Sequence, residues 1–226
     1  MKKIYNNSGA ICKFIPCINK GTYGRIYRIN DELCVKLFEL GSAKLYEVDP
    51  DVLCTIKNLN PRNFYEINDL LYDDNGKLIG YVMQYYEKED IDLLSMPVET
   101  IIKIVRGLYS ATRKLSDSKI TIRDMRQYNI IINQNNIIVI DVDAYFSDKK
   151  ISKKELLCDN VRRLYKMLEE LFYQAFTTYY RDMDEEFYDF IADLCGTIDE
   201  DKSIKAFCDI LKGHGSIIEY VKNKAK

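Results

Sequence analysis

The sequence predicts an α+β protein, with an antiparallel sheet in its first half and helices in its second half. Up to about residue 86, the apolar runs are short, rich in Ile, Val, Tyr and Phe, and separated by frequent turn signals, which is typical of strands. From about residue 97, apolar residues recur at helical spacing. The chain has 226 residues, 47% of them hydrophobic, which is enough for one large domain or two small lobes and excludes a disordered chain.

Strands are expected over residues 33–38 and 78–85. The second strand follows the turn 73–76, whose glycine can adopt positive φ. Between the strands, Pro50 after Asp49 has the position of a first helical residue behind its N-cap. One helix therefore interrupts the sheet, and its expected apolar face is formed by Val52, Ile56 and Leu59.

Two later segments have the apolar spacing of helices. The apolar positions are Ile101, Ile104, Val105, Leu108, Ala111 and Leu115 in the first segment, and Val161, Leu164, Tyr165, Leu168, Leu171 and Phe172 in the second. Between them, the apolar runs 130–132 and 137–140 flank the polar turn 133–136, which predicts a hairpin inside the helical half.

Charge and cysteine content exclude several classes of protein. The formal net charge of −2, from 33 basic and 35 acidic residues, gives no reason to expect nucleic acid or a membrane as a partner. No segment approaches the roughly 20 apolar residues of a membrane span, and no signal-peptide core is found, so we expect a cytoplasmic protein. The seven cysteines lack the paired spacings of a zinc or redox site and are expected to be buried thiols in a reducing compartment. They are Cys12, Cys17, Cys34, Cys54, Cys158, Cys195 and Cys208.

The segment 18–27 resembles the glycine-rich loop of protein kinases, in which small residues let backbone N–H groups approach triphosphate oxygens. The resemblance implies that Gly21, Thr22, Tyr23 and Gly24 contact the nucleotide. Two glycines at this spacing alone would also fit an ordinary tight turn. In this chain Asn19 stands where the family has its first glycine.

The strand 33–38 resembles the kinase strand whose lysine binds the α- and β-phosphates, which implies that role for Lys36. The alternative is a lysine that extends to the surface. The family holds this lysine with a carboxylate nine residues before a His-Pro pair. Here Asn60-Pro61 resembles that pair, so Asp51 is the implied carboxylate, with Glu47 as the alternative. An acidic residue at the start of a helix can also simply compensate the helix dipole.

The segment 81–86 resembles the strand and hinge that pass the adenine in protein kinases. The resemblance implies that Met83 is the gatekeeper. It also implies that backbone groups of Gln84, Tyr85 and Tyr86 face the base.

The sharpest match is the segment 121–130, which resembles the kinase catalytic loop with its Asp and Asn five residues apart. This spacing lets a carboxylate reach the acceptor hydroxyl while an amide oxygen on the same loop binds magnesium. The resemblance implies that Asp124 is catalytic, that Asn129 is a magnesium ligand, and that Arg126 supplies charge to the γ-phosphate. Ile122 stands where the family has a histidine.

Asp141, twelve residues after Asn129, resembles the main magnesium ligand of the family. Asp143 stands where the family has glycine, and it either binds a second ion or caps the next turn. Asp159 resembles the acid that opens the central C-lobe helix and anchors the catalytic loop. Because Asp159 follows Asp141 by only 18 positions, the activation segment is severely shortened.

Together these motifs imply a bilobal protein-kinase-like fold, with an N-lobe of five strands and one helix over 1–86 and a helical C-lobe over 87–226. The implied cofactors are ATP and Mg²⁺, and the implied function is transfer of the γ-phosphate to a serine or threonine hydroxyl of a protein. A small-molecule kinase is favoured by the Asp-x-Asp motif and the short activation segment. A pseudokinase is favoured by Asn19 and Ile122. The acceptor, a protein or a small molecule, is not identified by the sequence.

Overall fold

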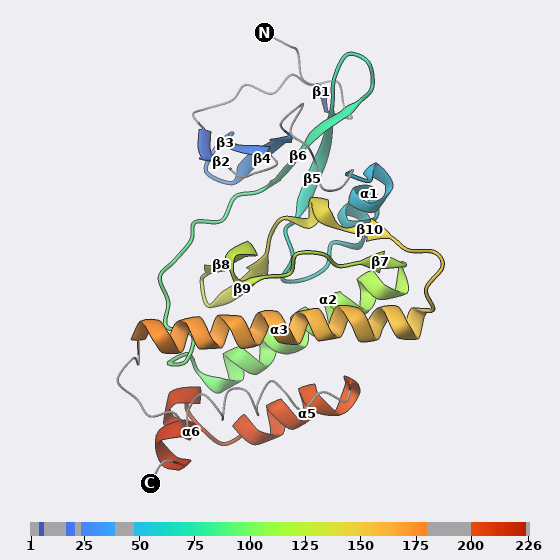
Figure 1. Cartoon of the computed structure of the whole chain (residues 1–226). Helices are drawn as coiled ribbons and strands as arrows, with labels where there is room; N and C mark the ends of the chain where they lie inside the picture. The colour runs from blue at the N-terminus through green and yellow to red at the C-terminus, as the bar shows by residue number, and fades with distance from the viewer. Residues whose placement is uncertain (1–4, 7–16, 21–23, 39–47, 180–199, 225–226) are drawn as a thin grey trace.

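The computed structural model describes residues 5–6, 17–20, 24–38, 48–179 and 200–224 (Figure 1). The protein is α+β, as the sequence predicts. Figure 1 shows an antiparallel sheet and one helix toward the end that holds the N-terminus, and the longer helices toward the end that holds the C-terminus. No helix in these ranges is both long and apolar enough to cross a membrane.

The main sheet has the strand order β1-β5-β6-β4-β3-β2, with every neighbouring pair antiparallel. Five strands have four or more residues, and β1 adds a two-residue edge. The strands are β1 Tyr5–Asn6, β2 Cys17–Lys20, β3 Gly24–Arg28, β4 Leu33–Phe38, β5 Ile67–Tyr72 and β6 Leu78–Gln84. The predicted strands over 33–38 and 78–85 are thus confirmed as β4 and β6.

The two faces of the sheet have different environments, because successive side chains of a strand point to opposite faces. Val35 pairs with Val82, and both belong to a small apolar cluster on one face. Lys36 pairs with Tyr81, whose face packs against the main core of the protein. The register of β4 therefore directs Lys36 toward the rest of the molecule.

Helix α1, Pro50–Leu59, begins as the sequence predicts. The Asp49 side chain accepts hydrogen bonds from the backbone N–H groups of Asp51 and Val52, and Pro50 follows this N-cap. The helix ends at Asn60, which adopts the left-handed conformation with φ 39°. Its buried residues Val52, Leu53 and Ile56 belong to the main core.

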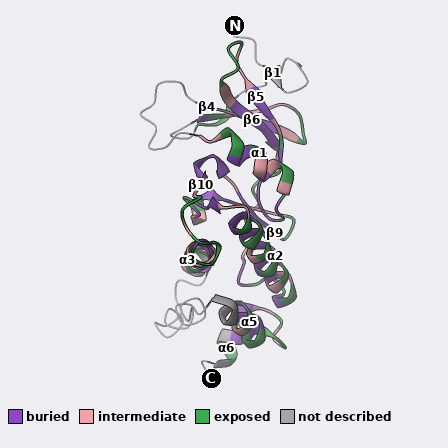
Figure 2. Ribbon diagram, turned by 90° about the vertical axis from the view of Figure 1, so that its right-hand side faces the viewer, coloured by how far each residue is buried: buried purple, intermediate pink, exposed green. Residues whose placement is uncertain are grey.

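The remaining helices are α2 Val98–Asp117, α3 Lys153–Tyr179, α5 Glu200–Leu211 and α6 Ile217–Lys224. All twelve apolar positions predicted for the faces of α2 and α3 are buried. In Figure 2, buried residues lie on the sides of α2 and α3 that face the interior, and exposed residues lie on the outer sides. Periodicity alone therefore identified which face of each long helix packs.

A helix was expected from the sequence to begin at Asp159, but α3 begins six residues earlier, at Lys153. Ser152 and Glu155 form a capping box: the Glu155 N–H donates to the Ser152 hydroxyl at 3.2 Å, and the Ser152 N–H donates to the Glu155 carboxylate at 3.1 Å. These hydrogen bonds lower the pKa of Glu155. The Ser-x-x-Glu spacing was the sequence signal for this start.

Two small sheets lie between α2 and α3 in the chain. Strand β7, Ile120–Thr121, pairs with β10, Phe146–Ser147, and β8, Ile130–Asn133, pairs with β9, Asn136–Val139. The second pair is the predicted hairpin. Its turn residues Gln134 and Asn135 have φ values of 47° and 57°, as a tight two-residue hairpin turn requires. Short 3₁₀ turns, Gln127–Asn129 and Val142–Ala144, precede β8 and follow β9.

The cysteines only partly match the expectation of buried thiols. Cys34 and Cys208 are buried, Cys158 is half-buried, and Cys17 and Cys54 are exposed, so the expectation is wrong for the last two. These five are free thiols, whereas Cys12 and Cys195 lie outside the described residues.

Candidate functional site

Lys36 joins the sheet to the segment that follows β9. Its Nζ donates to Oδ1 of Asp141 and to Oδ1 of Asp143, the latter at 2.8 Å. Lys36 is only 5% exposed, so it does not extend to the surface. The Lys36 ammonium therefore meets two carboxylates that lie more than 100 residues further along the chain.

The charges of this cluster depend on one another. Burial alone lowers the pKa of the Lys36 ammonium, but the carboxylates of Asp143 and Asp141 outweigh burial and hold the pKa above its ordinary value. Partial burial raises the pKa of Asp141, and the charge of Asp143 adds to the rise while Lys36 opposes it. Lys36 is thus a fixed positive charge at neutral pH.

Asp143 is the most buried member of the cluster, at 1% exposure. Its Oδ1 also accepts a hydrogen bond from the Tyr81 hydroxyl at 3.2 Å, while its Oδ2 has no partner among the described residues. The side chain therefore contacts Lys36 and Tyr81 and does not cap the turn, so that alternative is wrong. Tyr81 lies opposite Lys36 in the register of β4 and β6, which brings both side chains to Asp143.

Asp124 and Asn129, placed on one loop by their spacing, are joined by hydrogen bonds. Nδ2 of Asn129 donates to the backbone oxygen of Asp124 at 2.8 Å and to its Oδ2 at 3.0 Å, and the Tyr128 hydroxyl donates to Oδ1 at 2.8 Å. Both amide hydrogens of Asn129 are used, which leaves its Oδ1 as an acceptor. The backbone oxygen of Asn129 accepts from the N–H of Ile140 at 2.9 Å, so the loop is fixed beside Asp141.

Asp124 and Asp141 both adopt the left-handed backbone conformation, with φ values of 50° and 63°. Few residues other than glycine do so, because this conformation brings Cβ close to the backbone carbonyl. Such local strain is concentrated at functional sites, where the surrounding structure maintains it. Five other described residues outside glycine share this conformation, among them Asn60 at the end of α1 and Gln134 in the hairpin turn, so the conformation by itself does not identify a site.

Asn160, rather than Asp159, anchors the segment before Asp124. Its Oδ1 accepts from the backbone N–H of Ile122 at 2.9 Å, and its Nδ2 donates to the Ser116 hydroxyl and to the backbone oxygen of Ile120, both at 2.9 Å. Asp159 instead pairs with Arg162 on a more exposed part of α3. The expected anchor was wrong by one residue, because only one of the two neighbouring positions on the helix faces the core.

The two arginines near Asp124 have partners of their own. Arg126, the expected γ-phosphate contact, forms an ion pair with Glu170 of α3 at 2.7 Å, which raises the pKa of its guanidinium. The Arg123 guanidinium lies 4.0 Å from the centre of the Phe146 ring, a cation–π contact. Glu170 was not found from the sequence.

The expected carboxylate partner of Lys36 on α1 is not observed. Asp51 is exposed at the start of the helix, and no ion pair joins it to Lys36. Its backbone N–H donates to the Asp49 cap, which matches the alternative of an ordinary helix-start acid. Glu47 lies outside the described residues.

Of the expected glycine-rich loop, Gly24 alone is described, and Gly21, Thr22 and Tyr23 lie outside the described residues. Gly24 begins β3 and is buried. A Cβ at this position would lie 2.7 Å from the backbone oxygen of Leu37 and 3.4 Å from Cε of Lys36. Glycine is therefore required for β3 to pass close to the backbone of β4 at Leu37.

The expected adenine-facing residues follow the end of β6. Met83 is 1% exposed and lies in the main core. The N–H of Gln84 donates to the Glu66 oxygen at 3.1 Å, and the N–H of Tyr85 donates to the Glu32 oxygen at 2.6 Å. Within the described part of the chain, the Tyr86 N–H donates to no backbone oxygen outside the regular helices and strands. Of these three N–H groups, Tyr86 therefore has the one that is available to a ligand.

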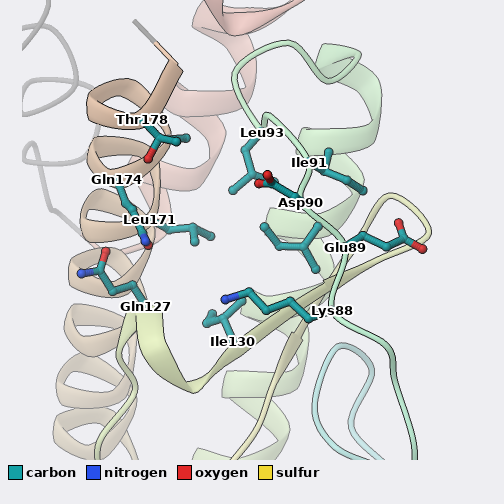
Figure 3. Close-up of a pocket in the computed structure, with 12 residues that line it drawn as sticks. Lys88, Glu89, Asp90, Ile91, Leu93, Gln127, Ile130, Leu171, Gln174 and Thr178 are labelled. Atoms are coloured by element: carbon teal, nitrogen blue, oxygen red, sulfur yellow. The ribbon is translucent and has the colours of Figure 1, made fainter. Parts of the chain in front are cut away.

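A cavity of about 170 Å³ lies beside this site, between the segment after β6 and helix α3 (Figure 3). Figure 3 shows Gln127, Gln174 and Thr178 on one side and Lys88 and Asp90 on the other. Gln127 comes from the loop between Asp124 and Asn129, and its Oε1 is buried without a partner among the described residues. The cavity therefore opens next to the Asp124 loop.

No cluster of three or more His, Cys, Asp or Glu side chains that could hold a metal ion occurs in the described part of the chain. Asp141 and the free Oδ1 of Asn129 provide two oxygen donors, which suits Mg²⁺ because this ion usually takes one or two protein oxygens together with phosphate oxygens and water. The chain matches no protein-family model, and no curated protein matches it significantly.

Proposed function

We propose that the protein is an ATP-dependent phosphotransferase with a bilobal protein-kinase-like fold, in which residues 1–86 and 87–226 form the two lobes. We further propose that it transfers the γ-phosphate to a serine or threonine hydroxyl of a protein. The observation that carries this proposal is the contact of the buried Lys36 in β4 with Asp141 and Asp143 after β9. The coupled pair of Asp124 and Asn129, fixed beside Asp141, supplies the second half of the site.

The residues present fit magnesium and a nucleotide. Lys36 is positively charged and already contacts carboxylate oxygens. Phosphate oxygens are also negatively charged, so Lys36 would bind them in the same way. Asp141 and Asn129 would hold Mg²⁺, and the backbone N–H of Tyr86 would bind the base. When bound, ATP would supply the phosphoryl group, and Mg²⁺ would neutralise part of the charge on its oxygens.

Asp124 would act on the acceptor. Its carboxylate would orient the acceptor hydroxyl and take the proton as the oxygen forms its bond to the γ-phosphorus and ADP leaves. Asn129 and Tyr128 hold this carboxylate through hydrogen bonds. These contacts would fix the direction in which Asp124 presents its oxygens.

A small-molecule acceptor is the second candidate. It is supported by the cavity beside Gln127 and by the short stretch from Asp141 to the start of α3 at Lys153, which leaves little chain for a peptide platform. Figure 3 shows polar side chains on both sides of this cavity, as a small hydroxylated compound would need.

Incubation with γ-labelled ATP, magnesium and a mixture of general protein acceptors tests the proposal. Labelled protein is the expected result. Label transferred only to compounds in a parallel panel of sugars and aminoglycosides would favour the small-molecule kinase. Magnesium-dependent ATP binding without any transfer would identify a pseudokinase, and the absence of ATP binding would refute the site.

A further inference from the structure

A basic groove lies on the outer side of α2, between this helix and α5. Its volume is about 710 Å³, and a second hollow of about 310 Å³ continues it toward the turn 133–136. The two hollows share Arg62 and Lys103. In Figure 2, this side of α2 is exposed, and α5 lies beside its end. We call the two hollows together the α2 groove.

The α2 groove has an excess of positive charge. Five basic side chains line it, against the two carboxylates of Glu99 and Asp209. The basic residues are Arg62, Lys103, Arg106, Lys114 and Lys212. Within the described ranges, none of the five forms an ion pair with an acidic side chain. Because the whole chain has a net charge of −2, this local excess is a specific feature and not the consequence of a basic protein.

The groove is elongated along α2. Lys103, Arg106, Ser110 and Lys114 recur every three or four residues and so lie along one face of the helix. At 1.5 Å per residue, the distance along the axis from Lys103 to Lys114 is about 16 Å, which is the length of roughly five extended residues. A single phosphate group would contact only one end of such a row.

Small residues form the middle of the groove. Ser110 lies between the basic residues Arg106 and Lys114, and its short side chain leaves room for a chain to approach the helix, whereas the space at Gly107 is filled by Asn63. At Gly107 a larger side chain is excluded, because a Cβ would lie 2.2 Å from Oδ1 of the buried Asn63. At the far end, the exposed amides of Gln134 and Asn135 can both donate to and accept from a peptide backbone.

We propose that the α2 groove binds an extended acidic peptide segment. On the basis of the proposed function, we infer that this segment is part of the protein acceptor. It would recruit the acceptor to a surface separate from Lys36 and Asp124. Glu99 and Asp209 disfavour a continuous polyanion such as nucleic acid, whereas a peptide can place its acidic side chains away from them.

Binding is tested with a fluorescent peptide of about eight residues, rich in Glu and Asp, by fluorescence anisotropy with the full chain. Its matched control replaces each acid by Gln or Asn. The acidic peptide is expected to bind at least about tenfold more tightly, and its affinity to fall as salt rises from about 50 to about 200 mM. Equal binding of both peptides would refute the proposal, as would a short oligonucleotide that binds more tightly than the acidic peptide.

Charge reversal locates the binding surface. The double variant Lys103→Glu/Arg106→Glu is expected to weaken binding of the acidic peptide by at least about tenfold. Arg163→Glu/Lys166→Glu, on the exposed side of α3, removes the same charge elsewhere and is expected to leave binding within about twofold. Both variants are checked for unchanged circular dichroism. An equal loss in both variants would show non-specific attraction and refute the groove.

Transfer measurements separate this inference from the proposed function. Fusing the acidic segment to a protein acceptor is expected to lower KM at least about fivefold with kcat unchanged, and the groove variant is expected to remove this gain. Specific binding without any transfer would reject the kinase and retain the peptide site. Transfer with the same KM for the acceptor with and without the acidic segment would reject recruitment through the α2 groove.

Discussion

The side-chain oxygen of Asn160 accepts a hydrogen bond from the backbone N–H of Ile122 at 2.9 Å, joining the long helix α3 to the segment that leads into Asp124. Asn160 is fully buried, and its amide donates two further hydrogen bonds, to Ser116 and Ile120. One side chain therefore connects α2, β7 and α3 directly behind the candidate catalytic residue.

Asn160→Leu is expected to lower the free energy of unfolding by about 2–4 kcal/mol, because buried polar groups of Ile122, Ser116 and Ile120 lose their partner. Urea denaturation measures the change. The matched variant Asp159→Ala removes only a partly exposed pair with Arg162 and should cost less than about 1 kcal/mol. A larger loss for Asp159→Ala than for Asn160→Leu would contradict the observed anchor.

Lys36→Ala is expected to abolish transfer and to lower the free energy of unfolding by about 3–5 kcal/mol, because it leaves the buried charge of Asp143 without its partner. Asp141→Asn should also abolish transfer but weaken magnesium-dependent ATP binding itself, with a smaller loss of stability because the Asp141 side chain is 40% exposed. Calorimetry and a transfer assay on the same preparations compare the two. Wild-type turnover in both variants would reject the site.

Asp124→Asn should separate chemistry from nucleotide binding. The carboxylate is placed to orient the acceptor hydroxyl, so its loss is expected to reduce transfer on the order of 10²-fold or more while magnesium-ATP affinity stays within a few-fold. Affinity and turnover are measured on one preparation. Unchanged turnover would remove Asp124 from catalysis.

The thiols are expected to differ in reactivity. Burial raises the pKa of Cys34 to about 12, although a hydrogen bond with Tyr65 opposes the rise. At about pH 8 its thiolate fraction is then on the order of 10⁻⁴, and it grows only as the pH approaches 12. Iodoacetamide at this pH should label the exposed Cys17 and Cys54 and spare Cys34, as mass spectrometry of the peptides will report. Rapid labelling of Cys34 in the folded protein would contradict its burial.

The sequence by itself determined the local structure of this protein. Pro50 behind Asp49 identified the start of α1, the turn 133–136 identified the hairpin, and apolar spacing identified the packed faces of α2 and α3. These features depend on residues a few positions apart, whose geometry is fixed by the helical or extended backbone. The five-residue spacing of Asp124 and Asn129 likewise placed both on one loop, where the structure shows a hydrogen bond between them.

Only the tertiary structure decided which distant residues meet. Lys36 contacts Asp143 rather than Asp51, Arg126 pairs with Glu170, and Asn160 replaces Asp159 as the anchor of the loop. Spacing along the chain cannot distinguish neighbouring polar residues whose roles depend on elements 38 to 107 positions away. The packing of α3 against α2 and the Asp124 loop sets the direction in which α3 presents its side chains. As a result Asn160 faces the core, and the neighbouring Asp159 is partly exposed to water.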